Sequence, residues 1–147
     1  MLYMLLNTGF SKLVAMPEYL SGWIEVTRLR NVDSKSVAVF VNEWIVRFGI
    51  PAMIIHDNGA ENSKITNILI NRYRVRNICI TSYHTQSNAV IERGHPQIMD
   101  GLAKPGPKWV KNQPFIVWAD RITIKPSTGF SPYSLVFGQT YVLLVEL

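Results

Sequence analysis

The chain has 147 residues, a length that fits one domain able to bury about 70% of its unfolded surface. Apolar residues make up 48% of the sequence and charged residues 17%, which excludes the intrinsically disordered class, and no apolar run reaches the roughly 18 residues of a membrane span. The net charge of +5 and the pI near 9.5 favour a polyanionic partner without establishing one, and the single cysteine excludes an internal disulfide.

Three short apolar segments at the start of the chain predict successive β-strands: Leu2–Leu6, Lys12–Met16 and Trp23–Leu29. Turn residues separate them, at Asn7–Gly9 and at Ser21–Gly22, so the three strands are predicted to be antiparallel. The second strand should be short, because Pro17 removes a donor from the hydrogen-bond ladder.

The first clear helix is predicted to begin at Asp33 or Ser34, either of which can cap it. Six apolar residues then recur at helical spacing and form one stripe: Val37, Phe40, Val41, Trp44, Ile45 and Phe48. Gly49 is expected to end the helix. We interpret this stripe as part of the core and not as a cofactor-binding surface.

A continuous apolar run over Ala52–His56 predicts a central strand buried on both faces. A second helix is predicted over Ser63–Tyr73, with Ile65, Ile68 and Leu69 facing inward. Three arginines gather near its end, where cations suit the helix dipole: Arg72, Arg74 and Arg76.

The remaining pattern predicts a last strand over Asn77–Thr81, a helix from Glu92 towards Lys104, and a helix over Trp109–Ile124 that is interrupted or restarted near Pro114. Three antiparallel strands, followed by strands that alternate with helices, predict an α/β fold. We expect a mixed five-stranded sheet flanked by helices.

Two carboxylates, Asp57 and Glu92, lie 35 positions apart (92 − 57 = 35) and have structural reasons to face one cleft. Asp57 stands where a strand stops and the turn at Gly59 begins, so its side chain is expected at the carboxyl end of that strand. Glu92 lies about one turn into a helix that the polar run Thr85–Asn88 opens. Oxygen donors on rigid elements suit Mg²⁺, although a two-metal phosphoryl-transfer site needs at least one more carboxylate.

Five ordered motifs extend this pattern over nearly the whole chain: LSGWIE at 20–25, DNGAEN at 57–62, YHTQSNAVIER at 83–93, WADR at 118–121 and TGFSPY at 128–133. Together they resemble the integrase catalytic core of retroviruses and gypsy-like LTR retrotransposons, which has an RNase H-like fold. The resemblance implies a core-like domain over residues 1–124, with residues 125–147 as a C-terminal extension of that core.

The resemblance implies that Asp57 and Glu92 are catalytic and bind Mg²⁺ or Mn²⁺. In that family a pair of such ions activates water or a DNA 3′-hydroxyl and stabilises the leaving 3′-oxygen. DNA is therefore the expected partner, and a homodimer is a state that the resemblance allows. No membrane partner is expected. The expected location is intracellular, and nuclear by family.

The family has a third carboxylate, on the first strand, and a match without gaps places it just before Met1. We therefore expect a chain that is truncated at its N-terminus and inactive as it stands. Glu18 is expected to be an ordinary strand-end or turn residue and not a substitute ligand. Relatives carry Pro where Thr85 stands and Gly where Ala89 stands, and Pro96 is expected to kink the helix of Glu92.

Six residues near the two carboxylates are expected to contact DNA: Asn58, Tyr83, His84, Gln86, Asn88 and Arg93. Simpler roles stay open for several of them. Asn58 can merely form a turn with Gly59, Asn88 can be only a helix cap, and Arg93 can be solvated. His56 is expected to be a satisfied residue at a strand end and not a metal ligand.

Two other functions remain compatible with the sequence. One is a non-catalytic, basic DNA-binding domain that retains the fold, with an affinity that depends on salt but not on Mg²⁺. The other is a protein-interaction module, which exposure of Trp109, Phe115 or Trp118 would favour, although we expect core positions for these residues.

Overall fold

The structure is a computed structural model that describes residues 2–5, 12–30, 33–57, 67–69, 71–80, 98 and 109–142. It divides into two compact units, each described by itself below: unit 1 (residues 1–15 and 27–90) and unit 2 (residues 16–26 and 91–147). The domain boundary predicted at residue 124 stays a prediction.

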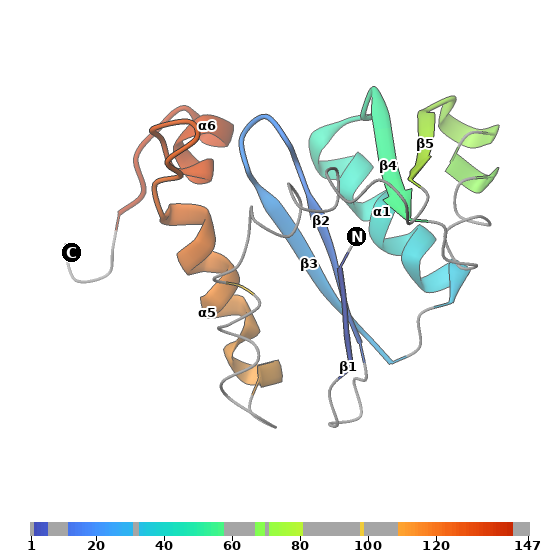
Figure 1. Ribbon diagram of the computed structural model, residues 1–147, viewed down its shortest axis with the longest axis horizontal. Coiled ribbons are helices and arrows are strands. Elements are labelled where there is room, and N and C mark those ends of the chain that lie inside the picture. The colour runs from blue at the N-terminus through green and yellow to red at the C-terminus, as the bar shows by residue number, and fades with distance from the viewer. Residues whose placement is uncertain are drawn as a thin grey trace. The chain divides into compact units, whose positions relative to one another are not determined.

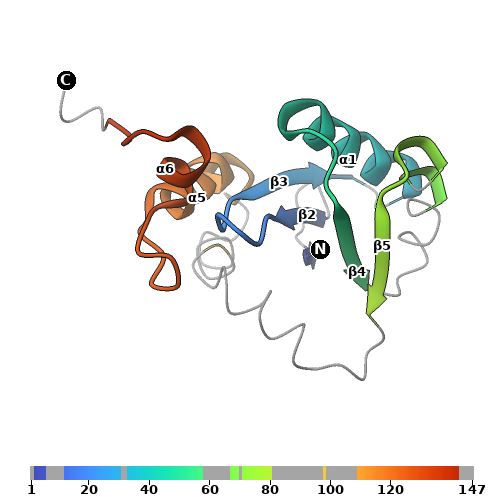
Figure 2. The same ribbon diagram turned by 90° about the horizontal axis from the view of Figure 1, so that it is seen from above.

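The strands form two sheets (Figures 1 and 2). The first has the order β1 (Leu2–Leu5), β2 (Lys12–Pro17), β3 (Ile24–Leu29), with β1 antiparallel to β2. The second is a parallel pair, β4 (Met53–Asp57) and β5 (Arg76–Ile80). The strands and the parallel pair were predicted.

The single five-stranded sheet was not confirmed, because no pairing joins β1 to β4 among the described strands. The hydrophobic pattern of a segment identifies it as a strand, but its neighbours depend on packing between distant parts of the chain.

Helix α1 (Ser34–Phe48) confirms the prediction from its cap and its apolar stripe. The Asp33 carboxylate accepts a hydrogen bond from the Ser36 N–H at 2.8 Å, which lowers the pKa of that carboxyl. Gly49, with φ of +89°, ends the helix and donates its N–H to the Ile45 carbonyl. Five of the six stripe residues are buried, whereas Phe48 is 38% exposed.

Two expectations about burial in unit 1 were wrong. Ala52 and Met53 are exposed, so the strand predicted over Ala52–His56 is not buried on both faces along its length. Ile68 is also exposed, whereas Leu69 beside it is buried as predicted. An apolar run shows that a segment favours burial, but it does not show how many faces the fold covers.

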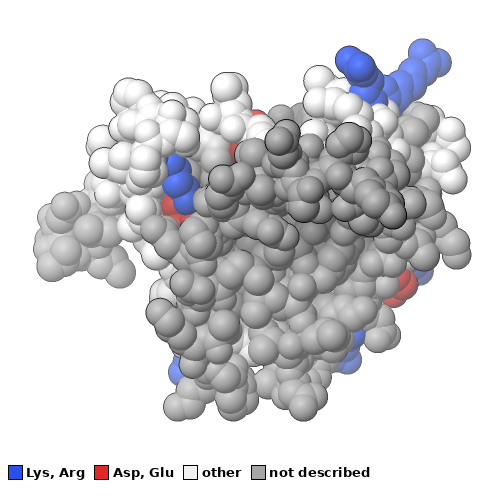
Figure 3. Space-filling view, in the orientation of Figure 1, with Lys and Arg blue, Asp and Glu red and all other residues white. Residues whose placement is uncertain are grey.

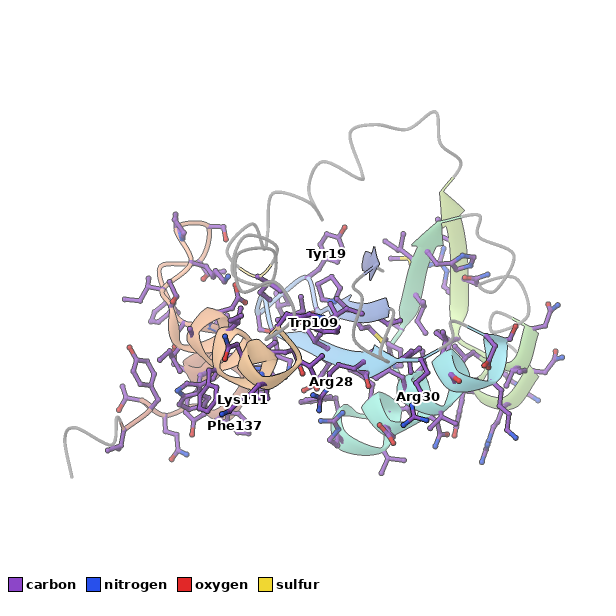
Figure 4. The ribbon with its side chains drawn as sticks, turned by 90° about the horizontal axis from the view of Figure 1, so that it is seen from below. Tyr19, Arg28, Arg30, Trp109, Lys111 and Phe137 are labelled. Atoms are coloured by element: carbon purple, nitrogen blue, oxygen red, sulfur yellow. The ribbon has the colours of Figure 1, made fainter. Side chains whose placement is uncertain are left out.

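Unit 2 contains α5 (Trp109–Ile122) and α6 (Pro132–Phe137). Trp109 in the first turn of α5 is fully buried, whereas Lys111 is exposed (Figure 4). Contrary to the sequence prediction, α5 runs through Pro114 without a break. Pro114 has no N–H to donate to the turn before it, so α5 continues through this position with one helical hydrogen bond fewer. Within the described residues, no helix is long and apolar enough to cross a bilayer.

Replacing Pro114 with alanine should raise the free energy of unfolding by about 1–3 kcal/mol. An interior proline destabilises a helix by about 3 kcal/mol, but it also lowers the conformational entropy of the unfolded chain, which offsets part of that cost. Thermal unfolding followed by circular dichroism measures the change. As a control, Phe115→Ala removes an exposed side chain at the next position and should change stability by less than about 0.5 kcal/mol. A lower melting temperature for Pro114→Ala would contradict the prediction.

Candidate functional site

Asp57 lies where the sequence placed it, at the last position of β4. Its Cα partner is Ile80, the last residue of the parallel strand β5. The carboxyl ends of parallel strands meet at one edge of the sheet, and residues there are well placed to line a site. His56, next to Asp57, is buried, as expected of a satisfied strand-end residue.

The position of the Asp57 side chain and the rest of the predicted site lie outside what the structure describes: Asn58, Tyr83, His84, Gln86, Asn88, Glu92 and Arg93. Their expected roles stay predictions. Among the described residues, no group of three or more His, Cys, Asp or Glu side chains is arranged to hold a metal ion. The prediction of a metal site depends on the carboxylates of Asp57 and Glu92 alone.

Two of the sequence motifs meet in unit 2 through Arg121, whose guanidinium lies 4.1 Å from the ring centroid of Trp23. Its Nε and Nη2 atoms donate to the Ile24 carbonyl at 3.1 and 2.8 Å, and Nη2 also lies 3.0 Å from Oε1 of Glu25. The same Glu25 oxygen accepts a hydrogen bond from the Trp23 indole at 2.9 Å. The WADR motif on α5 is thus bonded to the LSGWIE motif.

A second buried ion pair joins α5 to the loop that follows it. Lys125 donates from Nζ to Oδ1 of Asp120 at 2.6 Å, and the Asp120 side chain is 1% exposed. The backbone of Lys125 also closes the loop: its N–H donates to the Phe130 carbonyl, and its carbonyl accepts from Thr128 and Gly129. Gly129 has φ of +72°, a conformation that explains the glycine in the TGFSPY motif.

The rest of the TGFSPY motif builds α6 and covers Trp23. Ser131 caps the helix by accepting from the Ser134 N–H. Tyr133 packs against the rings of Trp118 and Phe137 at 5.7 and 4.8 Å, and Phe137 contacts Trp23 edge-on at 5.5 Å. Three motifs far apart in the sequence are therefore neighbours in unit 2, and their residues have structural roles there.

Sequence reasoning missed these roles, because it treated the motifs only as markers of a family. One signal in the sequence could have indicated these roles, namely charged residues inside apolar motifs. Glu25, Asp120 and Arg121 need partners if they are buried. The prediction for Glu18 is supported. Its carboxylate accepts from the N–H groups of Leu20 and Ser21 at 2.8 Å each and from the Ser21 hydroxyl, so it holds a turn.

The Glu18 turn predicts a pH-dependent stability. Partial burial opposes ionisation of this carboxyl, but the hydrogen bonds from Ser21 and Leu20 outweigh it and lower the pKa from its ordinary value of 4.5. Because the folded-state pKa is the lower one, the stabilisation is complete above about pH 4.5 and is lost as the pH falls through the folded-state pKa.

Accordingly, Glu18→Gln should destabilise the protein by about 1 kcal/mol at neutral pH and by less in acid, as measured by urea unfolding at several pH values. The exposed Glu43 provides a control, because Glu43→Gln removes a carboxylate without removing a turn. A Glu18→Gln difference that stays constant down to the lowest pH would contradict this assignment.

Comparison with solved structures identifies the fold. The catalytic core domain of BIV integrase matches with a TM-score of 0.71 and 20% sequence identity, over 90% of this chain and 88% of that one. The simian T-cell lymphotropic virus intasome in complex with PP2A regulatory subunit B56 gamma matches with the same TM-score and 15% identity, over 90% of this chain and 50% of that one. The fold is the mixed α/β, RNase H-like fold of an integrase core.

Two curated proteins are similar in sequence. One is the Gag-Pol polyprotein of avian reticuloendotheliosis virus, 29% identical over 136 residues, which are 88% of this chain and 12% of that protein. The other is the retrovirus-related Pol polyprotein from transposon 412 of Drosophila melanogaster, 29% identical over 128 residues, which are 82% of this chain and 10% of that protein. No protein-family model matches the chain.

The chain thus spans about a tenth of the length of these two polyproteins. In sequence and in fold together, it resembles the integrase catalytic cores of retroviruses and retrotransposons. The resemblance predicted from the five motifs is confirmed.

Proposed function

We propose that this chain is an integrase-type polynucleotidyl transferase core that binds DNA and a divalent metal ion but is inactive as it stands. The observation that carries the proposal is the position of Asp57, at the carboxyl end of a parallel strand pair within an integrase-core fold. A strand end of this kind presents a side chain from a rigid element, as a metal site requires.

Asp57 and Glu92 would hold the ion. Carboxylate oxygens are hard donors that suit Mg²⁺ and Mn²⁺, so the donor set fits the expected metal. The bound ion would supply Lewis-acid stabilisation to a phosphodiester. The residues proposed to hold the DNA end beside it are Asn58, Tyr83, His84, Gln86, Asn88 and Arg93.

Metal binding tests the proposal directly. Titration of Mn²⁺ into the 147-residue chain, followed by electron paramagnetic resonance, should show binding that weakens at least tenfold in both Asp57→Asn and Glu92→Gln. Glu43→Gln is the matched control, because it removes an exposed carboxylate from α1. Mn²⁺ binding that is unchanged in both site variants would refute the metal site.

Activity is a separate question, since this chain was expected to be inactive. Incubation with a duplex DNA end and either metal measures it, and absence of any cleaved or joined product would support that expectation. Metal-dependent products that disappear in both Asp57→Asn and Glu92→Gln would instead establish catalysis by the two carboxylates.

One observation also supports a second candidate, a protein-interaction module. Of the three aromatic residues that would favour it, Phe115 is 71% exposed and Trp118 is 38% exposed, whereas Trp109 is fully buried. Sedimentation equilibrium of the parent chain and of Phe115→Ser tests this candidate. It requires that the parent chain self-associates and that the variant does so more weakly.

A further inference from the structure

We propose that Arg72, Arg74 and Arg76 form a binding site for the phosphate backbone of duplex DNA, separate from the site at Asp57. The inference rests on the proposed function, because it takes DNA as the partner. All three arginines are exposed and follow one another across the connection between a helical turn at residues 71–73 and β5. Lys and Arg side chains project together from the surface where Figure 1 draws β5 (Figure 3).

The connection that carries the arginines is anchored on both sides. Val75 is buried between Arg74 and Arg76, and the Tyr73 hydroxyl donates to the side-chain oxygen of Asn42 on α1 at 2.6 Å. A support of this kind limits the motion of the arginine backbone and reduces the entropy lost when a ligand binds.

The helix dipole does not account for the arginines, since only Arg72 lies in the helical turn. Arg74 has φ of +53°, and it is the one non-glycine residue with positive φ in the part of the chain that the structure describes. Within that part, no carboxylate forms an ion pair with any of the three, so their guanidinium groups are available to an anion. Arginine donors match phosphate oxygens in a bidentate geometry.

The surroundings favour a duplex over a single strand. Single-stranded DNA is bound through aromatic rings on which bases stack. Tyr73 is the aromatic residue beside the cluster, but its hydroxyl is bonded to Asn42 and the Arg72 guanidinium lies over its ring at 5.3 Å. Among the described residues beside the cluster, no aromatic ring is thus free for stacking, and a surface that offers charge alone suits contacts to a duplex backbone.

The arginine cluster and the metal site lie at opposite ends of the same two strands. Arg76 pairs with Met53 at the start of the β4–β5 pair, and Asp57 pairs with Ile80 at its end. The two ends are four residue steps apart (57 − 53 = 4), about 13 Å along the strand direction. A duplex on the arginines is therefore a contact additional to a DNA end at Asp57.

The experiment measures duplex binding without metal. Fluorescence anisotropy with a short duplex of mixed sequence, in the presence of EDTA, gives Kd for the full chain between about 50 and 200 mM salt. The test variant replaces Arg72, Arg74 and Arg76 with glutamine. Its control replaces three other exposed cations with glutamine, Lys35, Arg47 and Lys111, so both variants have a net charge of +2 (5 − 3 = 2).

The test variant should bind the duplex roughly tenfold or more weakly at low salt, and the slope of log Kd against log salt should fall by about 0.9 per lost contact. The control should lose less than about threefold. Arg74→Gly provides a second variant that keeps the fold, since glycine adopts positive φ without steric cost, and its slope should fall by about 0.9.

Equal losses in the test and control variants would overturn the site, because net charge alone would then explain binding. So would competition by a polyglutamate peptide as strong as that by unlabelled duplex, which would mark an acidic protein as the better partner. Duplex binding is measured in EDTA and so does not depend on a bound metal ion. The Mn²⁺ titration described above can therefore fail while this site stands, and the reverse is also true.

Discussion

Replacing Arg121 with methionine is expected to lower the free energy of unfolding by about 3–5 kcal/mol, because it removes the guanidinium, itself 20% exposed, that pairs with a buried carboxylate. The partner is Glu25, whose side chain is 8% exposed. The Ile24 carbonyl also loses both of its donors from Arg121, and Trp23 loses the cation over its ring. This loss is a large fraction of the stability of an ordinary domain.

Thermal unfolding should show the loss as a fall in melting temperature of roughly 10 °C. Arg47 is a matched control, since it donates to the Glu43 carbonyl at 3.3 Å and lies 5.8 Å from the Phe48 ring centroid, but it is exposed. Arg47→Met should therefore cost less than about 0.5 kcal/mol.

A double variant separates the ion pair from the other contacts of Arg121. Arg121→Met combined with Glu25→Leu should recover part of the loss, because no charge is then left buried without its partner. A cost below about 1 kcal/mol for Arg121→Met would show that Arg121 does not stabilise unit 2. No recovery in the double variant would assign the loss to Ile24 and Trp23 instead.

The parts of the fold that the sequence predicted depend on interactions between residues close together in the chain. Helix α1 follows from a cap at Asp33, a stripe at helical spacing and a stop at Gly49. The position of Asp57 at a strand end follows from an apolar run that meets an Asn-Gly dipeptide, a sequence that favours turns. These signals operate over a few residues, so the sequence alone suffices to read them.

The parts that the sequence did not predict depend on packing between distant segments. Tertiary contacts decide whether β1 pairs with β4. They also decide whether α5 continues through Pro114 despite the destabilisation that a proline causes inside a helix. The hydrogen bonds from Arg121 to Ile24 join residues 97 positions apart. The local sequence around either residue does not identify the other as its bonding partner. A charged residue in an apolar motif indicates only that it needs some partner.

Contacts between distant segments also explain why three of the motifs contain the residues they do. LSGWIE, WADR and TGFSPY were interpreted as marks of a family, and unit 2 shows why residues of these types occur together. Arg121 needs Glu25 and Trp23, and the Lys125 loop needs a glycine at position 129. Loss of one partner is therefore expected to be costly even where no residue of the candidate metal site is changed.

The Asp120–Lys125 pair gives the second large prediction: Lys125→Met should destabilise the protein by about 3 kcal/mol, because the Asp120 carboxylate, 1% exposed, loses the ammonium 2.6 Å away. Urea unfolding measures the change, with Lys111→Met as the control, since that lysine is exposed on the same helix and should contribute less than about 0.5 kcal/mol.

Comparison of the two single variants with the double variant, Asp120→Asn with Lys125→Met, should give a coupling energy of about 1.5–3 kcal/mol. The hydrogen bonds of Lys125 to Phe130 and Gly129 are made by backbone atoms, so we expect the loop to stay closed in every variant and the coupling to report the side-chain pair. A coupling energy near zero would mean that Lys125 acts through its backbone alone and that other groups satisfy Asp120.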